Sequence, residues 1–218
     1  RYIGDWSSDV CSSDLKNTYP CYNYTMNNLF TALENQNKQI PLAEILRPKT
    51  IEDFLGQSNV ISPNSPILNL LKTNRLFSLI FWGTPGCGKT TLARLIATKT
   101  NANFIEISAV TSGVKDIKDA VDKAKEALRA GQKTILFIDE IHRYSKTQQD
   151  ALLPHLENGT LFLIGSTTEN PSFQVVPALL SRVQVVRLNP INDESMAQII
   201  KRGFSYLATH YTDRKSVV

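Results

Sequence analysis

The chain has 218 residues, of which 24 are Lys or Arg and 20 are Asp or Glu, so its formal net charge is +4. With 42% hydrophobic residues it can bury a core of one or two domains, and it is too apolar for a wholly disordered protein. No run approaches the roughly 18 apolar residues that a membrane-spanning helix needs, so we expect no membrane partner. The small positive excess permits contact with nucleic acid but does not argue for it.

The cysteines are Cys11, Cys21 and Cys87, an odd number with no Cys-x-x-Cys pair. This pattern is typical neither of a disulfide-stabilised secreted domain nor of a zinc site. We therefore expect a reduced, cytoplasmic protein.

Both ends of the chain look foreign to the protein. Residues 1–15 contain a near-duplication, and codons for Cys11–Leu15 and for Asp213–Ser216 can be written as reverse complements of one sequencing-adapter word. The alternative is an ordinary polar tail at each end, where disorder concentrates. We expect residues 1–25 to be disordered adapter or leader, 26–40 to be an N-terminal segment that starts at Met26, and 213–218 to be an adapter-derived tail.

From residue 41 onward, short apolar runs alternate with helical patterns. Runs that are apolar almost throughout are typical of strands covered on both faces, as in a parallel sheet. The runs occupy residues 79–82, 104–107, 135–138, 161–164 and 183–186. Helices are predicted over 90–100, over 114–130 up to Gly131, over 146–157 with an interruption at Pro154, and after an N-cap at Asn192. The alternation predicts an α/β fold.

The predicted helix over 114–130 shows the clearest amphipathic pattern in the chain. Lysines and acidic residues occupy one side of it, and a spaced set of apolar residues occupies the other. We expect this apolar set to be buried against the sheet: Val114, Ile117, Val121, Ala124 and Leu128.

Residues 83–90 read Gly-Thr-Pro-Gly-Cys-Gly-Lys-Thr and directly follow the first predicted strand. They fit the phosphate-binding pattern G-x-x-x-x-G-K-[ST], in which backbone N–H groups and a helix N-terminus surround phosphates. Lys89 is expected to reach the β- and γ-phosphates, and the Thr90 hydroxyl to bind Mg²⁺. We interpret Cys87 as a small filler rather than a redox thiol. The predicted ATP site comprises Gly83, Thr84, Pro85, Gly86, Cys87, Gly88, Lys89, Thr90 and Thr91.

Two carboxylates, Asp139 and Glu140, end the predicted strand over 135–138. In an open parallel sheet, the carboxyl end of such a strand lies beside the phosphate-binding loop. We expect Asp139 to hold Mg²⁺ and Glu140 to orient and polarise the attacking water. The second acid favours a hydrolase over a small-molecule kinase. We interpret the neighbouring His142 as structural rather than catalytic.

Two further positions have open interpretations. A hydroxyl within residues 165–171 could bind the γ-phosphate or the attacking water, or it could equally form a helix cap or a turn. Arg182, just before the last predicted strand, is either a surface or salt-bridge residue or a finger that reaches the ATP of a neighbouring subunit.

Longer strings of this sequence resemble AAA+ ATPases, and among them the replication-associated recombination protein A family, which is related to the clamp loaders. Residues 41–48 and 54–57 are similar to the N-terminal box that packs against adenine. The similarity runs from about residue 41 to about residue 188 and is most specific over 108–115 and 167–173. The other similar strings are residues 139–143 and 148–155.

The resemblance implies a P-loop NTPase fold of the AAA+ class, with parallel strands in the order 5-1-4-3-2 and helices on both faces. It implies that Thr168 registers the γ-phosphate, that Arg182 is the finger acting in trans, and that Arg47 and Pro48 lie near the base. Residues 41–190 would form the large ATPase module and 191–212 the start of a helical lid, most of which is missing. We expect this truncated chain alone to hydrolyse ATP slowly.

The resemblance also implies a DNA-dependent, Mg²⁺-requiring ATPase at stalled or gapped replication forks, associated with the bacterial nucleoid. Expected partners are DNA ends or single/double-strand junctions, single-stranded-DNA-binding protein, and further copies in a homotetramer. Three alternatives stay open: a clamp-loader subunit, a Holliday-junction branch-migration motor, and a non-hydrolysing nucleotide-binding scaffold.

Overall fold

The computed structural model describes residues 41–63 and 65–212. The predictions for residues 1–40 and for the tail 213–218 lie outside the described residues, and the adapter interpretation stays a prediction. In the part of the chain that is described, no helix is both long and apolar enough to cross a bilayer.

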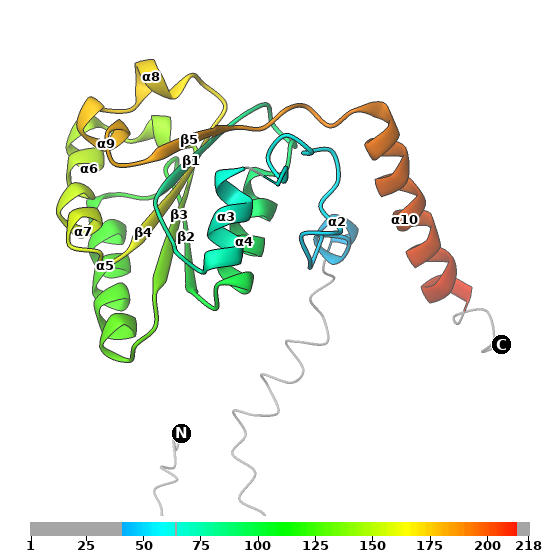
Figure 1. The fold of residues 1–218 in the computed structure, drawn as a ribbon, viewed down its shortest axis with the longest axis horizontal. Coiled ribbons are helices and arrows are strands. Elements are labelled where there is room, and N and C mark those ends of the chain that lie inside the picture. The colour runs from blue at the N-terminus through cyan, green and yellow to red at the C-terminus, as the bar shows by residue number, and fades with distance from the viewer. Residues whose placement is uncertain (1–40, 64, 213–218) are drawn as a thin grey trace, which may run out of the picture. The chain divides into compact units, whose positions relative to one another are not determined.

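A single parallel sheet forms the centre of the described chain, with its strands in the order β2-β3-β4-β1-β5 (Figure 1). Read from the other edge this is the predicted order, which is therefore confirmed. The strands are β1 (Leu79–Trp82), β2 (Asn103–Ser108), β3 (Thr134–Asp139), β4 (Phe162–Thr167) and β5 (Gln184–Arg187). Because β4 runs to Thr167, residues that we predicted in the following loop belong to the sheet.

Helices connect successive strands and lie on both faces of the sheet, as predicted (Figure 1). They are α2 (Leu42–Ile45), α3 (Pro66–Thr73), α4 (Lys89–Lys99), α5 (Val114–Arg129), the 3₁₀ turn η1 (Ile141–Arg143), α6 (Lys146–Asp150), α7 (Leu153–Glu157), α8 (Pro171–Gln174), α9 (Pro177–Leu180) and α10 (Asp193–Thr212).

Alternate residues of the central strands face two separate hydrophobic layers, as the two-residue period of a strand requires. On β3, Phe137 faces the layer formed by α3 and α4, whereas Leu136 faces the layer formed by α5, α6–α9 and their loops. Both side chains are fully buried. Burial on both faces holds the carboxyl ends of β1, β3 and β4 rigidly together, and these ends carry the predicted site.

Two helical predictions need correction. The apolar stripe of α5 is buried in its centre, but its end residues Val114 and Leu128 are 42% and 45% exposed, because the helix is longer than the sheet that it covers. The segment 146–157 forms two helices, α6 and α7, and the break falls at Ala151–Leu152, so that Pro154 lies in the first turn of α7. Proline is well tolerated there, since the first turn needs no N–H from it.

Helix α10 begins after Asn192, whose side-chain oxygen accepts a hydrogen bond of 3.0 Å from the backbone N–H of Ser195. This confirms the predicted N-cap. The helix contacts the segment 42–55, since a Cβ built at Gly203 would lie 3.3 Å from Leu46 and since Arg202 pairs with Asp53 at 3.5 Å. That residues 191–212 start a helical lid stays a prediction.

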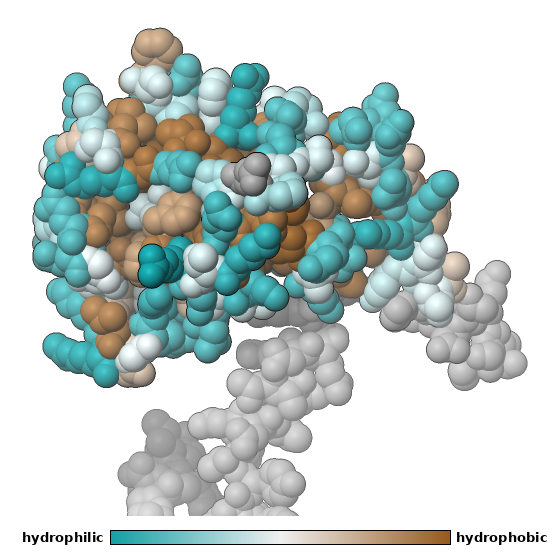
Figure 2. All heavy atoms as spheres, viewed as in Figure 1, coloured by the Kyte–Doolittle hydropathy of each residue, from teal (hydrophilic) through white to brown (hydrophobic). Residues whose placement is uncertain are grey.

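Hydrophobic residues form patches among hydrophilic ones over the part of the molecule where β5 runs (Figure 2). Within the described chain β5 is an edge strand of the sheet, and Val185 on it is 41% exposed. The nucleotide-site predictions concern the carboxyl ends of β1, β3 and β4.

Candidate functional site

The predicted phosphate-binding loop joins β1 to α4 and has the backbone that its glycines permit. Gly86 has a φ of +77°, and a Cβ built on it would meet no atom within 4 Å, so this backbone borders open space. Lys89 is only 8% exposed. Its Nζ donates hydrogen bonds of 2.8 Å and 3.0 Å to the carbonyls of Gly83 and Thr84. These two hydrogen bonds therefore hold the lysine ammonium against the backbone of the loop.

A cavity of about 320 Å³ opens between this loop and the end of β3. It is lined by most of the residues predicted for the ATP and Mg²⁺ site, whereas Gly83 and Thr84 line neither this cavity nor the second one described below. The lining residues are Arg47, Pro85, Gly86, Gly88, Lys89, Thr90, Thr91, Asp139 and Glu140. We refer to it as the phosphate cavity.

Asp139 lies at the last position of β3, and its carboxylate is held by the neighbouring strand. Ser166 of β4, which is fully buried, donates a 2.5 Å hydrogen bond from Oγ to Asp139 Oδ1 and accepts one of 3.2 Å from the backbone N–H of Glu140. Ser166 was not among the predicted site residues. An extension of the fourth strand pattern beyond residue 164 would have placed it beside Asp139.

Glu140 follows β3 in a left-handed backbone conformation, with φ 55° and ψ 51°. A non-glycine residue in this region carries about 1–2 kcal/mol of strain, and such residues gather at functional sites. Thr168 donates a hydrogen bond of 3.4 Å from Oγ1 to Glu140 Oε2. The two residues predicted to sense the γ-phosphate and to orient water thus contact each other.

His142 lies directly behind Glu140, in the turn η1. Its side chain is 5% exposed, and its Nδ1 is 3.1 Å from Glu140 Oε2 and 3.1 Å from Thr167 Oγ1. Its Nε2 is 3.6 Å from Glu169 Oε1. We interpreted His142 as structural from the sequence; in the structure it contacts the carboxylate predicted to act on water.

Other hydroxyl and amide groups at the end of β4 and in the segment after it make local turns. Thr167 Oγ1 accepts a 3.0 Å hydrogen bond from the N–H of Glu169, and Asn170 Oδ1 caps α8 through the N–H of Ser172 at 3.0 Å. The cap-and-turn interpretation therefore holds for Thr167 and Asn170, while Thr168 points to Glu140.

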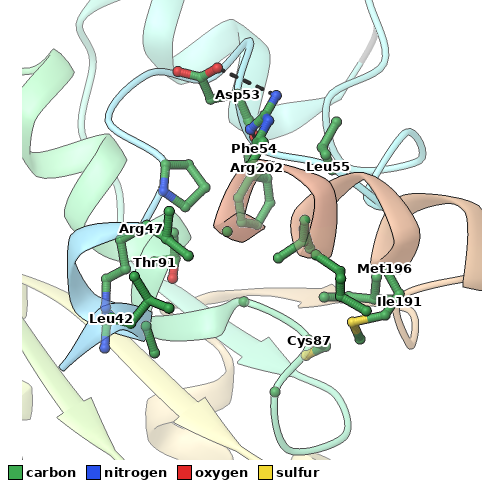
Figure 3. Close-up of a pocket in the computed structure, with 18 of the residues that line it drawn as sticks. Leu42, Arg47, Asp53, Phe54, Leu55, Cys87, Thr91, Ile191, Met196 and Arg202 are labelled. Atoms are coloured by element: carbon green, nitrogen blue, oxygen red, sulfur yellow. Dashed lines mark hydrogen bonds and ion pairs between the residues drawn. The ribbon is translucent and has the colours of Figure 1, made fainter. Parts of the chain in front are cut away.

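A second, larger cavity of about 580 Å³ adjoins the phosphate cavity and shares Arg47, Gly86, Gly88 and Thr91 with it. Side chains from the segment 42–55, the phosphate-binding loop and α10 surround it (Figure 3). Most of its lining is apolar, including Leu42, Leu46, Pro48, Phe54, Leu55, Ile191, Met196, Ile199, Ile200 and Leu207. A flat apolar base of a nucleotide suits such a lining. Both Arg47 and Pro48 line it, and that they lie near the base stays a prediction.

Ion pairs hold the segment 42–55 against the ATPase core. Arg94 of α4 contacts Glu44 of α2 at 2.6 Å and Glu106 of β2 at 2.8 Å. Glu44 also contacts Arg47 at 2.5 Å. These residues were not predicted from the sequence, since their pairing joins positions far apart along the chain. They fix the place of Arg47 between the two cavities.

Cys87 is 2% exposed, and burial raises the pKa of its thiol above the usual value although Lys89 opposes the rise. A buried neutral thiol has low reactivity. The side chain therefore acts as the small apolar filler that we predicted, and its carbonyl accepts a hydrogen bond of 3.2 Å from Gln57.

Arg182 lies away from both cavities. It follows α9 and pairs with Glu157 of α7, to which its Nη2 is 2.5 Å and its Nε 2.7 Å away. Within the described chain it is thus a salt-bridge residue, 39% exposed, and its action on a neighbouring subunit stays a prediction.

The two cavities fit a nucleoside triphosphate with Mg²⁺. Oxygen ligands suit this ion, which is usually bound by few protein groups together with phosphates and water. Thr90 and Asp139 supply such oxygens in the phosphate cavity, and Lys89 supplies a positive charge.

Comparison with known proteins agrees with this site. The model of the ATPase family associated with various cellular activities (AAA) matches residues 79–191, slightly more than half of the chain. The chain is 49% identical over 163 residues to replication-associated recombination protein A of Haemophilus influenzae. This match covers 75% of this chain and 36% of that protein. It is 48% identical over 182 residues to ATPase WRNIP1 of Dictyostelium discoideum. This match covers 83% of this chain and 21% of that protein.

Among solved structures, the chain resembles the Holliday junction branch migration motor RuvB of Thermotoga maritima, with a TM-score of 0.62 and 29% identity over 75% of this chain and 55% of that chain. The chain spans about a third of the length of the recombination proteins that it matches. The cavities, the residues that line them and the family match agree: the chain belongs to the AAA family of ATPases.

Proposed function

We propose that this chain is the nucleotide-hydrolysing module of a protein that couples Mg²⁺-dependent ATP hydrolysis to DNA remodelling or recombination at stalled or gapped replication forks. The ATPase part rests on the site itself. The DNA part rests on the recombination proteins of several bacteria that are 47–49% identical to this chain.

In this proposal the base of ATP occupies the apolar cavity and the triphosphate extends past Gly86 and Gly88 into the phosphate cavity. Lys89 and the backbone N–H groups of the loop neutralise the phosphates, and Thr90 and Asp139 hold Mg²⁺, which supplies further charge neutralisation. Glu140 accepts a hydrogen bond from a water molecule and orients it. The water oxygen bonds to the γ-phosphorus as the bond to the leaving ADP oxygen breaks, and the Glu140 carboxylate accepts the proton that this water gives up.

The observation that carries the proposal is the position of Glu140. Glu140 lines the phosphate cavity together with Asp139 and Lys89, and its backbone has a strained left-handed conformation. A scaffold that only binds nucleotide needs no carboxylate free to orient water there. This favours hydrolysis over the scaffold alternative.

The test is Glu140→Gln in the full-length protein. We expect ATP binding to persist and the steady-state turnover of ATP to fall by about 10²-fold or more, because the amide keeps the shape but loses the charge. Measured phosphate release with and without DNA, together with a nucleotide-binding titration, checks this. Unchanged turnover in Glu140→Gln would refute the role of this residue.

A branch-migration motor is the second candidate, because the fold resembles RuvB over 75% of this chain. The 29% identity to that structure is well below the 47–49% identity to the recombination proteins, which favours the first candidate. Movement of a four-way junction by the full-length protein would favour the motor. Preferential stimulation of its ATPase activity by gapped DNA or by single/double-strand junctions would favour the recombination protein. A clamp-loader subunit is less well supported, because the strings at residues 108–115 and 167–173 resemble the recombination proteins most specifically.

We further propose that the full-length protein assembles as a homotetramer, contacts single-stranded-DNA-binding protein, and acts in the bacterial cytoplasm at the nucleoid. In such an assembly Thr168 would register the γ-phosphate through its contact with Glu140, and Arg182 would complete the site of a neighbour. Sedimentation of the full-length protein with ATP tests the assembly.

A further inference from the structure

We propose that His142 is a positioning residue for Glu140, and that it links this carboxylate to the segment after β4. The inference rests on the proposed ATPase function and adds to it a residue that need not touch the nucleotide. It starts from the contacts of one buried imidazole.

The first observation is how closely His142 approaches Glu140. Its Nδ1 is 3.1 Å from Glu140 Oε2, and its side chain is 5% exposed whereas that of Glu140 is 28% exposed. A carboxylate can only accept hydrogen bonds, so a hydrogen bond at this distance needs the ring hydrogen on Nδ1, the nitrogen that faces Glu140. The imidazole therefore contacts the carboxylate from the protein side and leaves its other side to the cavity.

The second observation is that the imidazole ring is itself fixed by β4 and the segment that follows. Thr167 Oγ1 lies 3.1 Å from Nδ1, and Thr167 is fully buried. Glu169 Oε1 lies 3.6 Å from Nε2 at the opposite side of the ring. The contact of Nδ1 with the buried Thr167 hydroxyl restricts the rotation of the ring, so the ring can in turn restrict Glu140.

The third observation is the backbone of Glu140. Its left-handed conformation is strained, and strain of this kind persists only where surrounding contacts overdetermine it. Two contacts converge on Glu140 Oε2: Nδ1 of His142 at 3.1 Å and Oγ1 of Thr168 at 3.4 Å. Together they hold the carboxylate at one position on the wall of the phosphate cavity.

These contacts form a continuous connection from the backbone of Glu169 through Thr167 and His142 to Glu140. The same segment continues into α8, where Phe173 is 83% exposed. A movement of the segment after β4 would therefore change the position of Glu140 without any direct contact with ATP. The proposal assigns the orientation of the carboxylate to this connection, and binding of ATP to other residues.

The experiment compares three variants of the full-length protein. His142→Asn can place its amide N–H near the position of Nδ1, His142→Gln can only place it near Nε2, and His142→Phe keeps the ring without a donor. We expect turnover at saturating ATP to fall about 10- to 100-fold in His142→Phe and in His142→Gln, the usual cost of losing a group that orients another. We expect His142→Asn to recover most of the loss, and KM for ATP to change little in all three.

A matched control is His155→Phe on α7, a histidine outside both cavities, for which we expect no loss of turnover. A double variant Glu140→Gln with His142→Phe is expected to lose no more than Glu140→Gln alone, since the histidine acts through the glutamate. If His142→Phe does not fold, the comparison of His142→Asn with His142→Gln decides in the same way.

Equal losses in His142→Asn and His142→Gln, with intact thermal stability, would overturn the proposal. So would a further loss when His142→Phe is added to Glu140→Gln. Loss of turnover in Glu140→Gln with wild-type turnover in His142→Phe would contradict the role of His142 alone. Unchanged turnover in Glu140→Gln would contradict the proposed function instead, so the two failures are distinguishable.

Discussion

At the scale of single residues, the two carboxylates at the end of β3 are held by different means. Asp139 stays in the extended strand and is fixed through the Ser166 hydroxyl of β4, at 2.5 Å. Glu140 leaves the strand in a left-handed conformation and is held by Thr168 and by His142. Neighbouring positions in the sequence thus receive different orientations, as a metal ligand and a water-orienting group require.

Ser166→Ala tests how far the fixed orientation of Asp139 matters. The variant removes the hydroxyl that donates to Asp139 and that accepts from the Glu140 N–H, so we expect a loss of stability of about 1 kcal/mol. We also expect the Mg²⁺ concentration for half-maximal ATPase activity to rise about 10-fold. A Mg²⁺ titration of the full-length protein measures this. Ser62→Ala, whose hydroxyl donates to Asn59 outside the phosphate cavity, is the control; an equal Mg²⁺ dependence in both variants would argue against the role of Ser166.

At the scale of elements, the start of α4 lies in close contact with the segment 42–55. Gly88 precedes α4 with a φ of +99°, and a Cβ built on it would lie 2.8 Å from the ring of Phe54. Phe54 also lines the apolar cavity. The phosphate-binding loop and the segment expected to contact the base therefore constrain each other.

Gly88→Ala should for this reason weaken nucleotide binding as well as folding. We expect a loss of stability of at least about 1–2 kcal/mol, from the left-handed backbone and from the collision with Phe54, and a lower affinity for ATP. Gly131→Ala is a matched control, because Gly131 has a φ of +77° but open space around its Cβ position. It should lose stability by backbone strain alone and bind ATP normally. Thermal unfolding and a nucleotide titration distinguish the two, and equal ATP affinities would contradict the importance of the Phe54 contact.

At the scale of the whole molecule, the position of Arg182 makes it unsuitable for the nucleotide site of its own chain. It pairs with Glu157 and lines neither cavity. It is nevertheless 39% exposed, so its guanidinium is accessible to another subunit. If it acts at all on ATP, it does so at the site of a neighbour.

Mixing two inactive full-length variants tests this role. Glu140→Gln supplies an intact Arg182, and Arg182→Ala supplies an intact Glu140. Random pairing of equal amounts in a closed ring forms complete sites at about a quarter of the interfaces, so we expect activity well above the sum of the two separate variants. If co-assembled mixtures show only that sum, the action of Arg182 in trans is wrong.

The sequence by itself determined the class of fold and most of the phosphate cavity. Apolar runs alternating with helical patterns predicted the parallel sheet, because strands buried on both faces must be apolar throughout. The phosphate-binding pattern and the Asp139–Glu140 pair are local signals, in which residues adjacent in sequence act together. Residues 83–91 and 139–140 were therefore predictable, and the resemblance supplied the order of the strands.

Only the tertiary structure decided which side chains hold these groups in place. Ser166 meets Asp139 because β4 lies next to β3, and Arg94 of α4 joins Glu44 to Glu106 because the fold brings α2 and β2 within its reach. Such contacts join residues whose distance along the chain carries no periodic signal. The same holds for His142, whose pattern in the sequence is that of an ordinary buried histidine. The sequence specifies the chemical groups of the site locally, whereas their orientation comes from long-range packing, which no local pattern records.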